Sequence, residues 1–366
     1  MRLFSDIAAC VQDSYLRRAL SLAGNGRGTT SPNPMVGCVI VRDGVVVGEG
    51  YHERAGGPHA EVVALTRARE AAEGAIAYVT LEPCDHFGRT PPCTQALIAA
   101  GVAGVVIGMP DPTAEAAGGA ARLREAGIGV KFAEETAPFE ELNEAWLHHL
   151  ATGLPYVHVK VALSLDGHPT SAGGVRSRVS GSGGSEITRR VRAAADAVLV
   201  GASTARVDEP ALTVRDESGV VAEHQPLRVI LSAEGEVPDA SLFHDGAGEA
   251  VALVAGDAMA PEGVSALRYD SSGGLEAALR TLASERGVRR VLVETGPRLF
   301  TALWEQGLIN ELTVVHAGGV FGDAAPAVFL GGDRGGSQDL ERPMQAVEAG
   351  AIDGDAVSVW RPTRQE

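Results

Sequence analysis

The run PHAEVVAL at residues 58–65 and the run LEPCDHFGRTPPC at residues 81–93 decide how the first half of this chain folds. Together they supply the imidazole of His59 and the thiols of Cys84 and Cys93, which are three of the four ligands of a tetrahedral zinc site. Helix-like segments begin at His59 and at Cys93, so we expect the ligands at helix N-termini, where partial positive charge favours thiolate over thiol. A fourth position left to water is typical of catalytic zinc.

Glu61 stands two residues after His59, and its carboxylate gives that water a use. Attack of a zinc-bound water on a carbon centre needs a nearby base that takes up and delivers protons, and Glu61 is the predicted base. The arrangement of histidine, glutamate and a proline–cysteine pair is the known signature of zinc-dependent nucleobase deaminases. That signature usually has two residues between its cysteines, whereas the eight residues DHFGRTPP lie between Cys84 and Cys93.

The first half alternates strand-like and helix-like segments, which predicts a sheet with helices on its faces. Residues 35–41 and 45–50 flank the turn Arg42-Asp43-Gly44 and predict a hairpin. Further strands are expected at 75–81, 105–109 and 127–132, and helices at 59–73 and 138–150. The segment TGLP at 152–155 is typical of a linker, so we expect one domain over residues 1–151 and a second over 152–366.

The second half predicts a mostly parallel α/β sheet, with strands at 156–167, 197–201, 227–231, 249–256, 288–294 and 311–318. A stretch rich in glycine and serine follows its first strand and runs through residue 185. The sharpest pattern is VLVETGPRLFTALWEQG at 291–307, a strand, a turn and a helix. Free amides at such a helix start can hold a phosphate, although glycine turns between strand and helix are common without one.

Composition narrows the classes of protein. The chain has 366 residues, of which 45% are hydrophobic and 21% charged, as in globular domains. Four cysteines are too few for a disulfide scaffold, and we expect Cys10 and Cys38 to be buried apolar residues. Asp6 and Asp13 interrupt the first apolar run, which predicts neither a signal peptide nor a membrane anchor, and therefore a cytoplasmic protein.

The charge balance argues against a nucleic-acid partner. The chain has 47 acidic and 31 basic residues and a net charge of −16, whereas binding of a phosphate backbone needs a basic surface. Aromatic residues, at 4%, also leave few platforms on which single-stranded bases stack. Any phosphate that this chain handles is expected on a small molecule.

The pattern extends over longer runs in both halves: SPNPMVGCVIV, GYHERAGGPHAEVVAL and YVTLEPCDHFGRTPPCTQALIAAGV, then KVALSLDG, VRAAADAVLVGASTARVDEPALTVR and VETGPRLFTALWEQGLINELTVV. In these runs the chain resembles the bifunctional riboflavin-biosynthesis deaminase-reductases, and the long insertion between the cysteines is typical of that family. The resemblance implies a cytidine-deaminase-like three-layer sandwich followed by an α/β domain similar to dihydrofolate reductase.

The resemblance also implies an activity and its cofactors. The substrate would be 2,5-diamino-6-ribosylamino-4(3H)-pyrimidinone 5′-phosphate, a small phosphoribosyl pyrimidine whose ring amine leaves as ammonia. The first domain would use Zn²⁺, and the second would use NADPH to reduce the ribosyl group of the product to a ribityl chain. A homodimer or homotetramer is implied as well.

The resemblance assigns roles to residues of the first half. His59, Cys84 and Cys93 would hold zinc, and Glu61 would shuttle a proton from the metal-bound water to the ring nitrogen and then to the departing ammonia. The residues that would line the substrate site are Asn33, His52, His86, Arg89 and Asp111. Each has a structural alternative: Asn33 as a turn residue, and His52 or His86 as ordinary surface or core histidines. The guanidinium of Arg89 suits a substrate phosphate.

In the second half the family's motif positions fall on both substrate and cofactor residues. Lys160, Arg192, Leu212, Arg215 and Glu294 would serve the substrate, and Ser164, Thr204, Asp208 and Gly296 the cofactor; Asp166 also matches a motif residue.

The chain departs from the family at several positions. Thr113 stands where an asparagine is expected after Asp111, and Gly318 replaces a proline. Arg176 stands in place of a substrate-binding serine, and Arg178 in place of a tryptophan along the cofactor, which is not a conservative change. Arg178 would then pair with the cofactor's 2′-phosphate, or the reductase would be weak or lost.

Three alternatives remain open at this level. The first is an active deaminase joined to a degenerate, non-catalytic reductase-like domain. The second is a deaminase of another nucleoside or of RNA, which the acidic charge and the eight-residue insertion oppose. The third is a structural zinc with His86 as a fourth ligand, which leaves Glu61 without a role.

Overall fold

The computed structural model describes residues 2–88, 91–170, 179–256, 258–322, 325, 327–328 and 342–363. It divides into two compact units, Met1–Leu147 and His148–Glu366, each of which is described by itself. The division falls inside one helix, α6 (Glu144–Thr152), whose last residue adjoins the domain boundary expected from the sequence.

The first unit is built on a five-stranded sheet in the order β2-β1-β3-β4-β5. The first two strands form an antiparallel hairpin, β1 pairs antiparallel with β3, and the remaining pairs are parallel. The strands are β1 (Gly37–Arg42), β2 (Val45–Tyr51), β3 (Ile76–Leu81), β4 (Gly104–Met109) and β5 (Gly129–Phe132).

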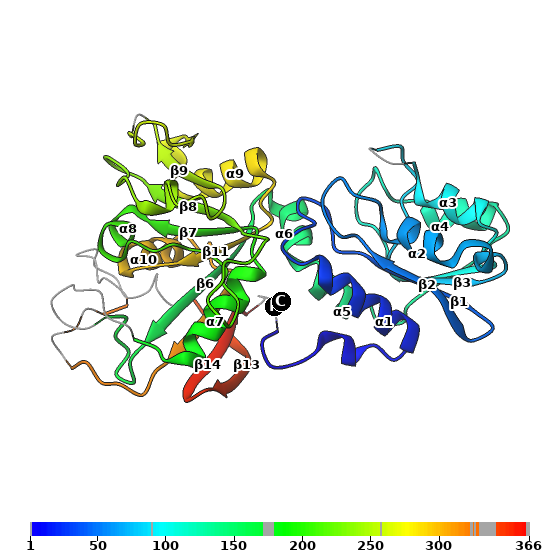
Figure 1. Ribbon diagram of the computed structural model, residues 1–366, viewed down its shortest axis with the longest axis horizontal. Helices are drawn as coiled ribbons and strands as arrows, with labels where there is room; N and C mark the ends of the chain where they lie inside the picture. The colour runs from blue at the N-terminus through cyan, green and yellow to red at the C-terminus, as the bar shows by residue number, and fades with distance from the viewer. Residues whose placement is uncertain are drawn as a thin grey trace. The chain divides into compact units, whose positions relative to one another are not determined.

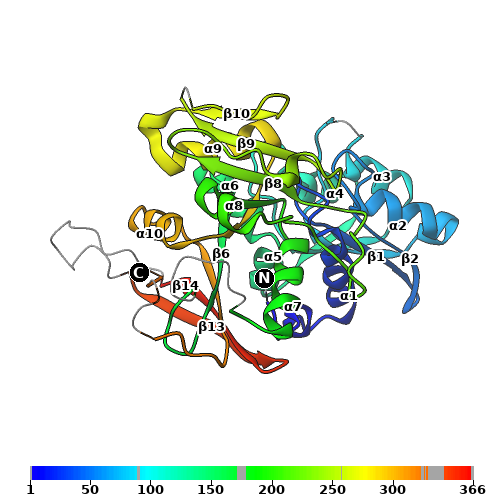
Figure 2. The ribbon, with the colours of Figure 1, turned by 60° about the vertical axis from the view of Figure 1, so that its left-hand side comes forward.

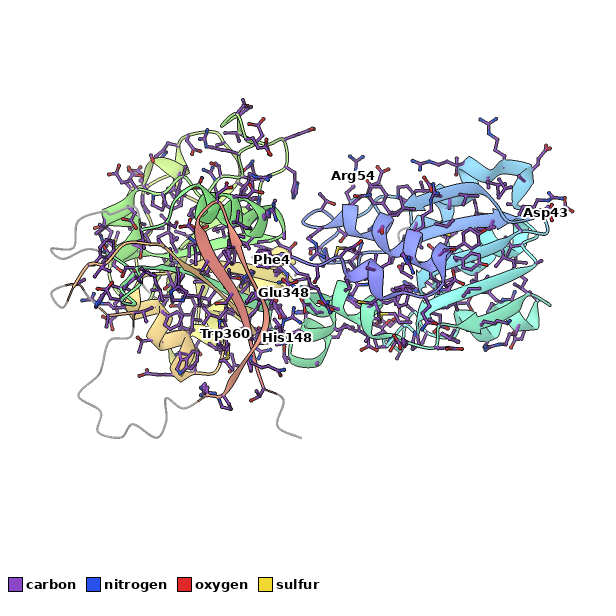
Figure 3. All side chains as sticks on the ribbon, turned by 90° about the horizontal axis from the view of Figure 1, so that it is seen from below. Phe4, Asp43, Arg54, His148, Glu348 and Trp360 are labelled. Atoms are coloured by element: carbon purple, nitrogen blue, oxygen red, sulfur yellow. The ribbon has the colours of Figure 1, made fainter. Side chains whose placement is uncertain are left out.

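The hairpin turn consists of Asp43 and Gly44, with φ angles of 50° and 77°. Two successive left-handed residues suit the twist of a two-residue hairpin loop, and Asp-Gly is a favoured pair for it. Figure 3 shows Asp43 at the tip of this turn. The predicted hairpin is confirmed.

Helices cover both faces of this sheet, as Figure 1 shows. Alternate residues of β1 point to opposite faces: Cys38 and Ile40 pack with α2, α3 and α4, while Val39 and Val41 pack with α1. A second apolar cluster joins α1 to α5 and α6. The helices are α1 (Ser14–Ala23), α2 (Ala60–Ala68), α3 (Cys93–Ala99), α4 (Gly119–Glu125), α5 (Ala137–Leu142) and α6, with short 3₁₀ turns at Ile7–Cys10, Gly24–Gly26 and Arg69–Ala72.

The second unit has a nine-stranded sheet in the order β10-β9-β8-β7-β11-β6-β12-β14-β13. Every neighbouring pair from β10 to β12 is parallel, and β14 and β13 continue it as an antiparallel hairpin. The strands are β6 (Tyr156–Leu163), β7 (Ala197–Gly201), β8 (Leu227–Ser232), β9 (Ala250–Ala255), β10 (Ala266–Tyr269), β11 (Arg290–Glu294), β12 (Glu311–His316), β13 (Met344–Ile352) and β14 (Asp355–Pro362).

Helices of the second unit bury an apolar core against the strands. Leu279 and Leu282 of α9 and Phe300 and Leu303 of α10 pack on valines of β6 and β11. Ile187 and Val191 of α7 are fully buried. The helices are α7 (Ser182–Ala193), α8 (Ala202–Asp208), α9 (Gly274–Arg286) and α10 (Pro297–Glu305), with 3₁₀ turns at Ser241–Phe243 and Ser271–Gly273.

Several elements differ from those expected from the sequence. The helix expected over 59–73 ends at Ala68 and continues as a 3₁₀ turn, and the helix expected over 138–150 is broken at Asn143 into α5 and α6. Helix α7 begins inside the stretch rich in glycine and serine, for which no helix was predicted. Figure 2 shows α7 beside the hairpin of β13 and β14, which the sequence pattern missed together with β10.

Two further observations bear on the composition. Cys38 is buried, as expected, but Cys10 is exposed, so the prediction for Cys10 is wrong. No helix in the described part of the chain is both long and apolar enough to cross a membrane.

Candidate zinc site and reductase site

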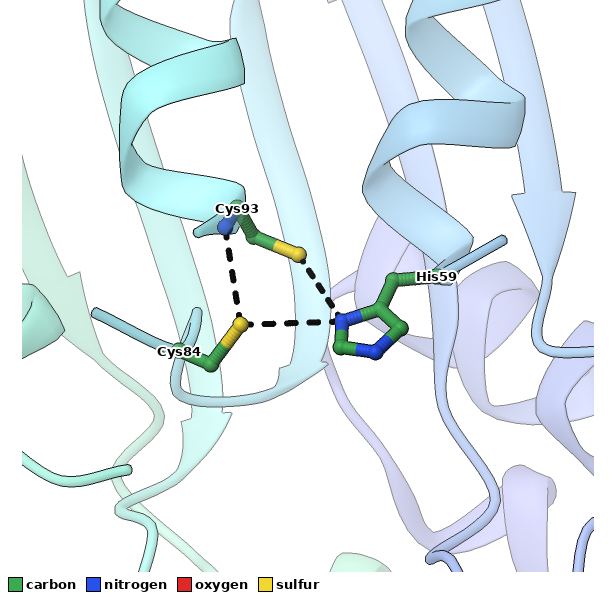
Figure 4. Close-up of side chains that lie close together, drawn as sticks. All are labelled: His59, Cys84 and Cys93. Atoms are coloured by element: carbon green, nitrogen blue, oxygen red, sulfur yellow. Dashed lines mark hydrogen bonds between the residues drawn. The ribbon is translucent and has the colours of Figure 1, made fainter. Parts of the chain in front are cut away.

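Three side chains of the first unit converge at the carboxyl end of β3, as Figure 4 shows. The Nδ1 atom of His59 lies 3.1 Å from the Cys93 sulfur and 3.6 Å from the Cys84 sulfur. The ligand atoms of all three residues lie within 4.8 Å of one another, and no other such group occurs among the described residues. The predicted ligand set is therefore brought together.

The local folding of the chain places each ligand. His59 is the N-cap of α2, and Cys93 is the first residue of α3. Cys84 follows β3 through Glu82 and Pro83, and Glu82 is a buried carboxylate. The Glu82 side chain accepts hydrogen bonds from the backbone N–H groups of Ala120 at 2.9 Å and Asp111 at 3.3 Å. It thus ties the cysteine segment to α4 and to the loop after β4.

The donor set fits zinc. Zn–S bonds are about 2.3 Å and Zn–N bonds about 2.0 to 2.1 Å, so sulfur and nitrogen ligands on one tetrahedral ion lie roughly 3.5 Å apart. The two sulfur–nitrogen distances from His59, 3.1 and 3.6 Å, lie near that value. His86 is exposed and does not join the group, so among the described residues the structural-zinc alternative finds no fourth ligand.

The two sulfurs differ in how readily they lose a proton. The Cys93 thiol, the backbone N–H of Cys93 and the His59 imidazole donate toward Cys84 and lower its pKa to about 4. The same thiol-to-sulfur hydrogen bond and burial raise the pKa of Cys93. Contrary to expectation, Cys84 lies at no helix start, so hydrogen bonds and not a helix terminus favour its thiolate, while Cys93, which does open a helix, has its pKa raised. Zinc binding requires both sulfurs as thiolates, so the Cys93 thiol has to lose its proton.

Glu61 lies beside the ligands on the first turn of α2 and is only 3% exposed. Burial raises the pKa of its carboxyl group, which His59 partly opposes. A carboxyl with a raised pKa is suited to accept a proton and to give it back near neutral pH. The position and chemistry of Glu61 match its predicted role as the base.

A cavity of about 350 Å³ opens over the ligands. It is lined by four of the predicted residues, Asn33, His59, Cys84 and His86, and by the loop of Ala55, Gly56 and Gly57. A larger cavity of about 720 Å³ lies at the amino ends of β3, β4 and β5 and contains none of the predicted site residues.

Asn33 and His52 interact at the edge of the 350 Å³ cavity over the zinc ligands. His52 is buried, its Nδ1 lies 3.0 Å from the carbonyl oxygen of Pro58, and its Nε2 lies 3.3 Å from the amide nitrogen of Asn33. Donation from Nδ1 to the carbonyl leaves Nε2 to accept from Asn33. Burial lowers the pKa of His52, which favours this neutral form. The ring also meets that of His59 edge-on, with centroids 5.7 Å apart.

Asp111 follows β4, and its carboxylate accepts hydrogen bonds from Thr113, which stands where the family has an asparagine. Thr113 donates to one Asp111 carboxylate oxygen twice, from its backbone N–H at 2.8 Å and from its hydroxyl at 2.6 Å. Burial raises the pKa of Asp111, and these hydrogen bonds oppose that rise. Arg89 lies outside the described residues.

The second unit gathers charged residues at the carboxyl ends of its parallel strands, the edge where ligands bind in open α/β sheets. Lys160 of β6 and Glu294 of β11 are register partners. Arg192 of α7 bonds to both Glu294 carboxylate oxygens, at 2.5 and 2.7 Å, and donates to the Thr213 carbonyl at 2.9 Å. The predicted residues Lys160, Arg192 and Glu294 therefore meet at one place.

Electrostatics set the charge states in this cluster. Burial alone would raise the pKa of Glu294, but the charge and paired hydrogen bonds of Arg192 outweigh it and the pKa is lowered. Burial likewise opposes the raised pKa of Arg192, which the Glu294 charge maintains. Burial lowers the pKa of Lys160, and Glu294 only partly offsets this.

Leu212 and Arg215 lie on the loop after α8. Leu212 is fully buried with φ of 54°, a left-handed conformation that a leucine adopts only at a cost of about 1 to 2 kcal/mol. The Nε of Arg215 donates to the Thr213 hydroxyl at 3.2 Å, and its Nη1 donates to the Gly219 carbonyl at 2.9 Å. The loop thus carries both predicted residues and the carbonyl that Arg192 contacts.

The predicted cofactor residues follow β6, β7 and β11. A Cβ atom on Gly296, the N-cap of α10, would lie 3.1 Å from the Thr204 hydroxyl of α8, so these two positions are adjacent. Asp208 is the last residue of α8. Beyond β6, the Ser164 hydroxyl donates to the Asp166 carboxylate at 2.5 Å.

Asp166 holds the segment after β12 in place through hydrogen bonds. Its carboxylate accepts from the backbone N–H groups of Phe321 and Gly322, at 3.1 and 2.7 Å. The hydrogen bond from Ser164, followed by those from Gly322 and Phe321, lowers the pKa of Asp166. Gly318 lies exposed in the same segment. Arg176 and Arg178 lie outside the described residues.

Sequence reasoning missed several residues that hold these sites together. Asp355 accepts from the N–H groups of Gly181 and Gly184 and so caps α7, which carries Arg192. No local signal indicates this contact, because Asp355 is far away in the sequence. Glu82 stands inside the motif run itself, where a buried carboxylate next to a ligand offered a signal. The other missed residues are Thr213, Asn143 and Gln225.

Comparison with family models matches both halves of the chain. Residues 11–109 match the cytidine and deoxycytidylate deaminase zinc-binding region, and residues 155–355 match the RibD C-terminal domain. The first match contains the zinc ligands and Glu61, and the second contains the Lys160, Arg192 and Glu294 cluster.

Whole-chain relatives agree with both models. The riboflavin biosynthesis protein RibD of Escherichia coli is 42% identical over 330 residues, which cover 86% of this chain and 90% of that protein. The structure of Acinetobacter baumannii RibD has a TM-score of 0.85 at 37% identity and covers 96% of this chain and 98% of that one. A Thermotoga maritima diaminohydroxyphosphoribosylaminopyrimidine deaminase/5-amino-6-(5-phosphoribosylamino)uracil reductase has a TM-score of 0.82 at 31% identity, covering 96% and 98%.

Proposed function

Because the chain belongs to the RibD family, we propose that it acts on the compounds named for its Thermotoga maritima relative, with the residue roles set out below. It is a bifunctional enzyme of riboflavin biosynthesis with a zinc-binding deaminase domain and an NADPH-dependent reductase domain. Both halves find relatives, so the comparisons give no support to the alternative of a degenerate reductase half.

The observation that carries the deaminase proposal is the convergence of His59, Cys84 and Cys93, with buried Glu61 beside them. Zinc held by these three residues would lower the pKa of a water and present it as a nucleophile. The 350 Å³ cavity above them admits one small ring system, which agrees with a pyrimidine substrate.

Glu61 moves the protons in this proposal. Its carboxylate accepts a proton from the attacking water and delivers it to the ring nitrogen next to the carbon under attack. Glu61 would then take the remaining proton from the hydroxyl now bonded to that carbon and pass it to the exocyclic amine; the carbon–nitrogen bond breaks, ammonia leaves and the ring carbon becomes a carbonyl. Asn33 and His52 would orient the ring at the cavity edge, and His86, Arg89 and Asp111 would contact the remainder of the substrate, with Arg89 suited to its phosphate.

In the reductase domain, NADPH would supply the hydride that converts the ribosyl group to a ribityl chain. Lys160, within β6, and Glu294, the last residue of β11, lie side by side, where a sugar hydroxyl can bond to both an ammonium and a carboxylate. Arg192 orients Glu294 and, with Arg215, provides positive charge for the substrate phosphate. Leu212 would pack on the substrate between them.

The cofactor would lie along the loops after β6, β7 and β11. We assign Ser164, Thr204, Asp208 and Gly296 to it. The N-terminus of α10 begins at Gly296 with Pro297 at its first position, and its free amides suit a pyrophosphate. Adjacent placement of Thr204 and Gly296 supports a shared ligand.

Three further features belong to the proposal. We propose that residues 1–151 act as the deaminase domain and residues 152–366 as the reductase domain. The enzyme is proposed to be cytoplasmic and to form a homodimer or homotetramer.

One experiment tests both activities. The purified enzyme is incubated with the diaminohydroxyphosphoribosylaminopyrimidine, with and without NADPH, and the products are identified by mass. Without NADPH we expect loss of the ring amine alone, and with NADPH a further gain of two hydrogens. A deaminated product that stays unreduced with NADPH would overturn the reductase assignment, and an unchanged substrate would overturn the deaminase assignment.

A further inference from the structure

Two carboxamide side chains, Asn143 in the first unit and Gln225 in the second, bond to the backbone in the same way. Asn143 accepts from the N–H of Met35 at 2.8 Å and donates to the carbonyl of Met35 at 3.0 Å. Gln225 accepts from the N–H of Val214 at 2.7 Å and donates to the carbonyl of Val214 at 2.9 Å. A backbone residue that exchanges both bonds with one partner is held as in an antiparallel ladder. Each carboxamide therefore acts as a strand partner for one residue.

The residue held by Asn143 lies on a substrate segment. Met35 comes two residues after Asn33, and the next carbonyl, that of Val36, accepts from the His52 N–H at 2.9 Å. We call the pair of bonds from one carboxamide to one backbone residue a clamp. The Asn143 clamp thus fixes the backbone between the two side chains that meet at the cavity edge, Asn33 and His52. Asn143 is 2% exposed, so water does not compete for these bonds.

The residue held by Gln225 also lies on a substrate segment. Val214 directly follows Thr213, whose carbonyl accepts from Arg192 and whose hydroxyl accepts from Arg215. Gln225 makes a third bond, to the Ala222 carbonyl at 2.8 Å, and the N–H of Ala222 donates to the Val214 carbonyl at 3.0 Å. One side chain therefore closes the loop that contacts both substrate arginines.

We propose that Asn143 and Gln225 are positioning residues, each holding through its carboxamide the loop that places its own domain's substrate residues. The proposal deepens the function given above and rests on it. Neither carboxamide is assigned a contact with the substrate or the cofactor. Loss of a clamp should loosen a binding loop, so KM should rise more than kcat falls.

The first variant is Gln225→Met, which keeps the length of the side chain and removes all three hydrogen bonds. We expect the reductase KM for the deaminated product to rise on the order of tenfold, as the loss of a few net hydrogen bonds allows. The deaminase activity of the same chain should stay unchanged, which provides an internal check that the protein is intact.

A matched control separates positioning from general weakening. Asn310 is a side-chain partner of the backbone in the same unit, since its Oδ1 accepts from the N–H of Val157 at 2.7 Å, but this bond lies at the amino end of β6. Asn310→Ala should lower the melting temperature without raising the reductase KM. An equal rise in KM in both variants would overturn the positioning role of Gln225.

The second variant is Asn143→Leu, measured for deaminase kinetics, zinc content and reductase activity. We expect a raised deaminase KM with one zinc per chain retained and the reductase unaffected. Should either variant fail to fold, Gln225→Glu and Asn143→Ser, which keep an acceptor, are measured in the same way.

A KM within about twofold of the unaltered enzyme, in folded variants of both residues, would overturn the inference, because lost hydrogen bonds on a binding loop would then have no effect on binding. Failure of the proposed function is distinguishable, since the unaltered enzyme itself would then neither release ammonia nor oxidise NADPH.

Discussion

The zinc site and the reductase site differ in how far along the chain their residues come from. His59 and Cys93, which meet at 3.1 Å, are 34 residues apart, and Cys84 lies between them. Arg192 and Glu294, which meet at 2.5 Å, are 102 residues apart, and Arg192 also bonds to a loop that Gln225 closes. The metal centre is thus specified by a few residue types at short spacing, whereas the ion-pair site depends on the alignment of a whole sheet.

The largest effect is expected from Glu61→Gln, which tests whether the zinc site depends on one proton carrier. The amide cannot accept a proton at neutral pH, so deaminase kcat should fall by about 10² to 10⁴. Zinc content, measured by metal analysis, should remain one per chain, because Glu61 is not a ligand.

The control for this variant is the other domain. Supplied with the deaminated product, Glu61→Gln should oxidise NADPH at the rate of the unaltered enzyme. Full deaminase activity in this variant would remove Glu61 from the mechanism, and loss of zinc would show that the carboxylate supports the metal instead.

The second prediction concerns Arg192→Gln in the reductase site, whose residues come from distant parts of the chain. The change leaves Glu294 facing Lys160 without its bidentate partner, at a position about one-fifth exposed. We expect the reductase kcat/KM to fall on the order of a hundredfold and the second unit to lose about 2 kcal/mol of stability. Lysine at this position should not restore activity, since it cannot form the paired hydrogen bonds.

The stability loss should depend on pH in a defined direction. In the unaltered enzyme the pKa of Glu294 is lowered, so its contribution is present above the unfolded value of about 4.3 and is lost as pH falls through the lower folded value. In Arg192→Gln, burial would raise that pKa instead. Melting curves should therefore differ most at neutral pH, and the difference should shrink as the pH falls below the unfolded value of about 4.3 and through the lower folded value; a constant difference would count against this account.

The sequence predicted the zinc site and the position of most strands along the chain because these depend on local pattern. The apolar run of β1 and the Asp43-Gly44 turn specify a hairpin without help from elsewhere. Helix α7 could not be predicted in the same way, since its N-terminal amides are capped by Asp355, 171 to 174 residues away. The β13 strand is largely exposed and mixes Glu, Gly and Ala with few β-branched residues, so its pattern is weak. Figure 3 shows Glu348 and Trp360 on this hairpin.

The contacts within the two sites likewise divide into those that the sequence predicted and those that it did not. Spacing placed His59, Cys84 and Cys93 together, but only the family resemblance brought Arg192 to Glu294. The clamps of Asn143 and Gln225 had no sequence signal, because a carboxamide in a loop gives no indication of which backbone group it will meet.

The third prediction is a smaller effect at Asp166, which joins two distant segments of the second unit. Asp166→Asn keeps the shape but removes the charge that accepts from Ser164, Phe321 and Gly322. Because Ser164 is assigned to the cofactor, the KM for NADPH should rise about fivefold, as for the loss of one charge-assisted hydrogen bond. The KM for the deaminated product, from the same initial-rate experiments, should stay constant, and a change in that constant alone would reassign Asp166 to the substrate.

The smallest effect is expected at Thr113, where the compact site departs from its family. The threonine hydroxyl donates to Asp111 at 2.6 Å, and the backbone N–H of Thr113 donates to the same oxygen. Thr113→Val removes only the hydroxyl bond, so the deaminase kcat/KM should fall by about threefold with zinc content unchanged. Thr113→Asn restores the family residue and should recover activity if its amide reaches the substrate. Equal activity in all three forms would mean that the zinc site works without this contact. A loss as large as that of Glu61→Gln would mean that deamination depends on residues beyond the zinc ligands and Glu61.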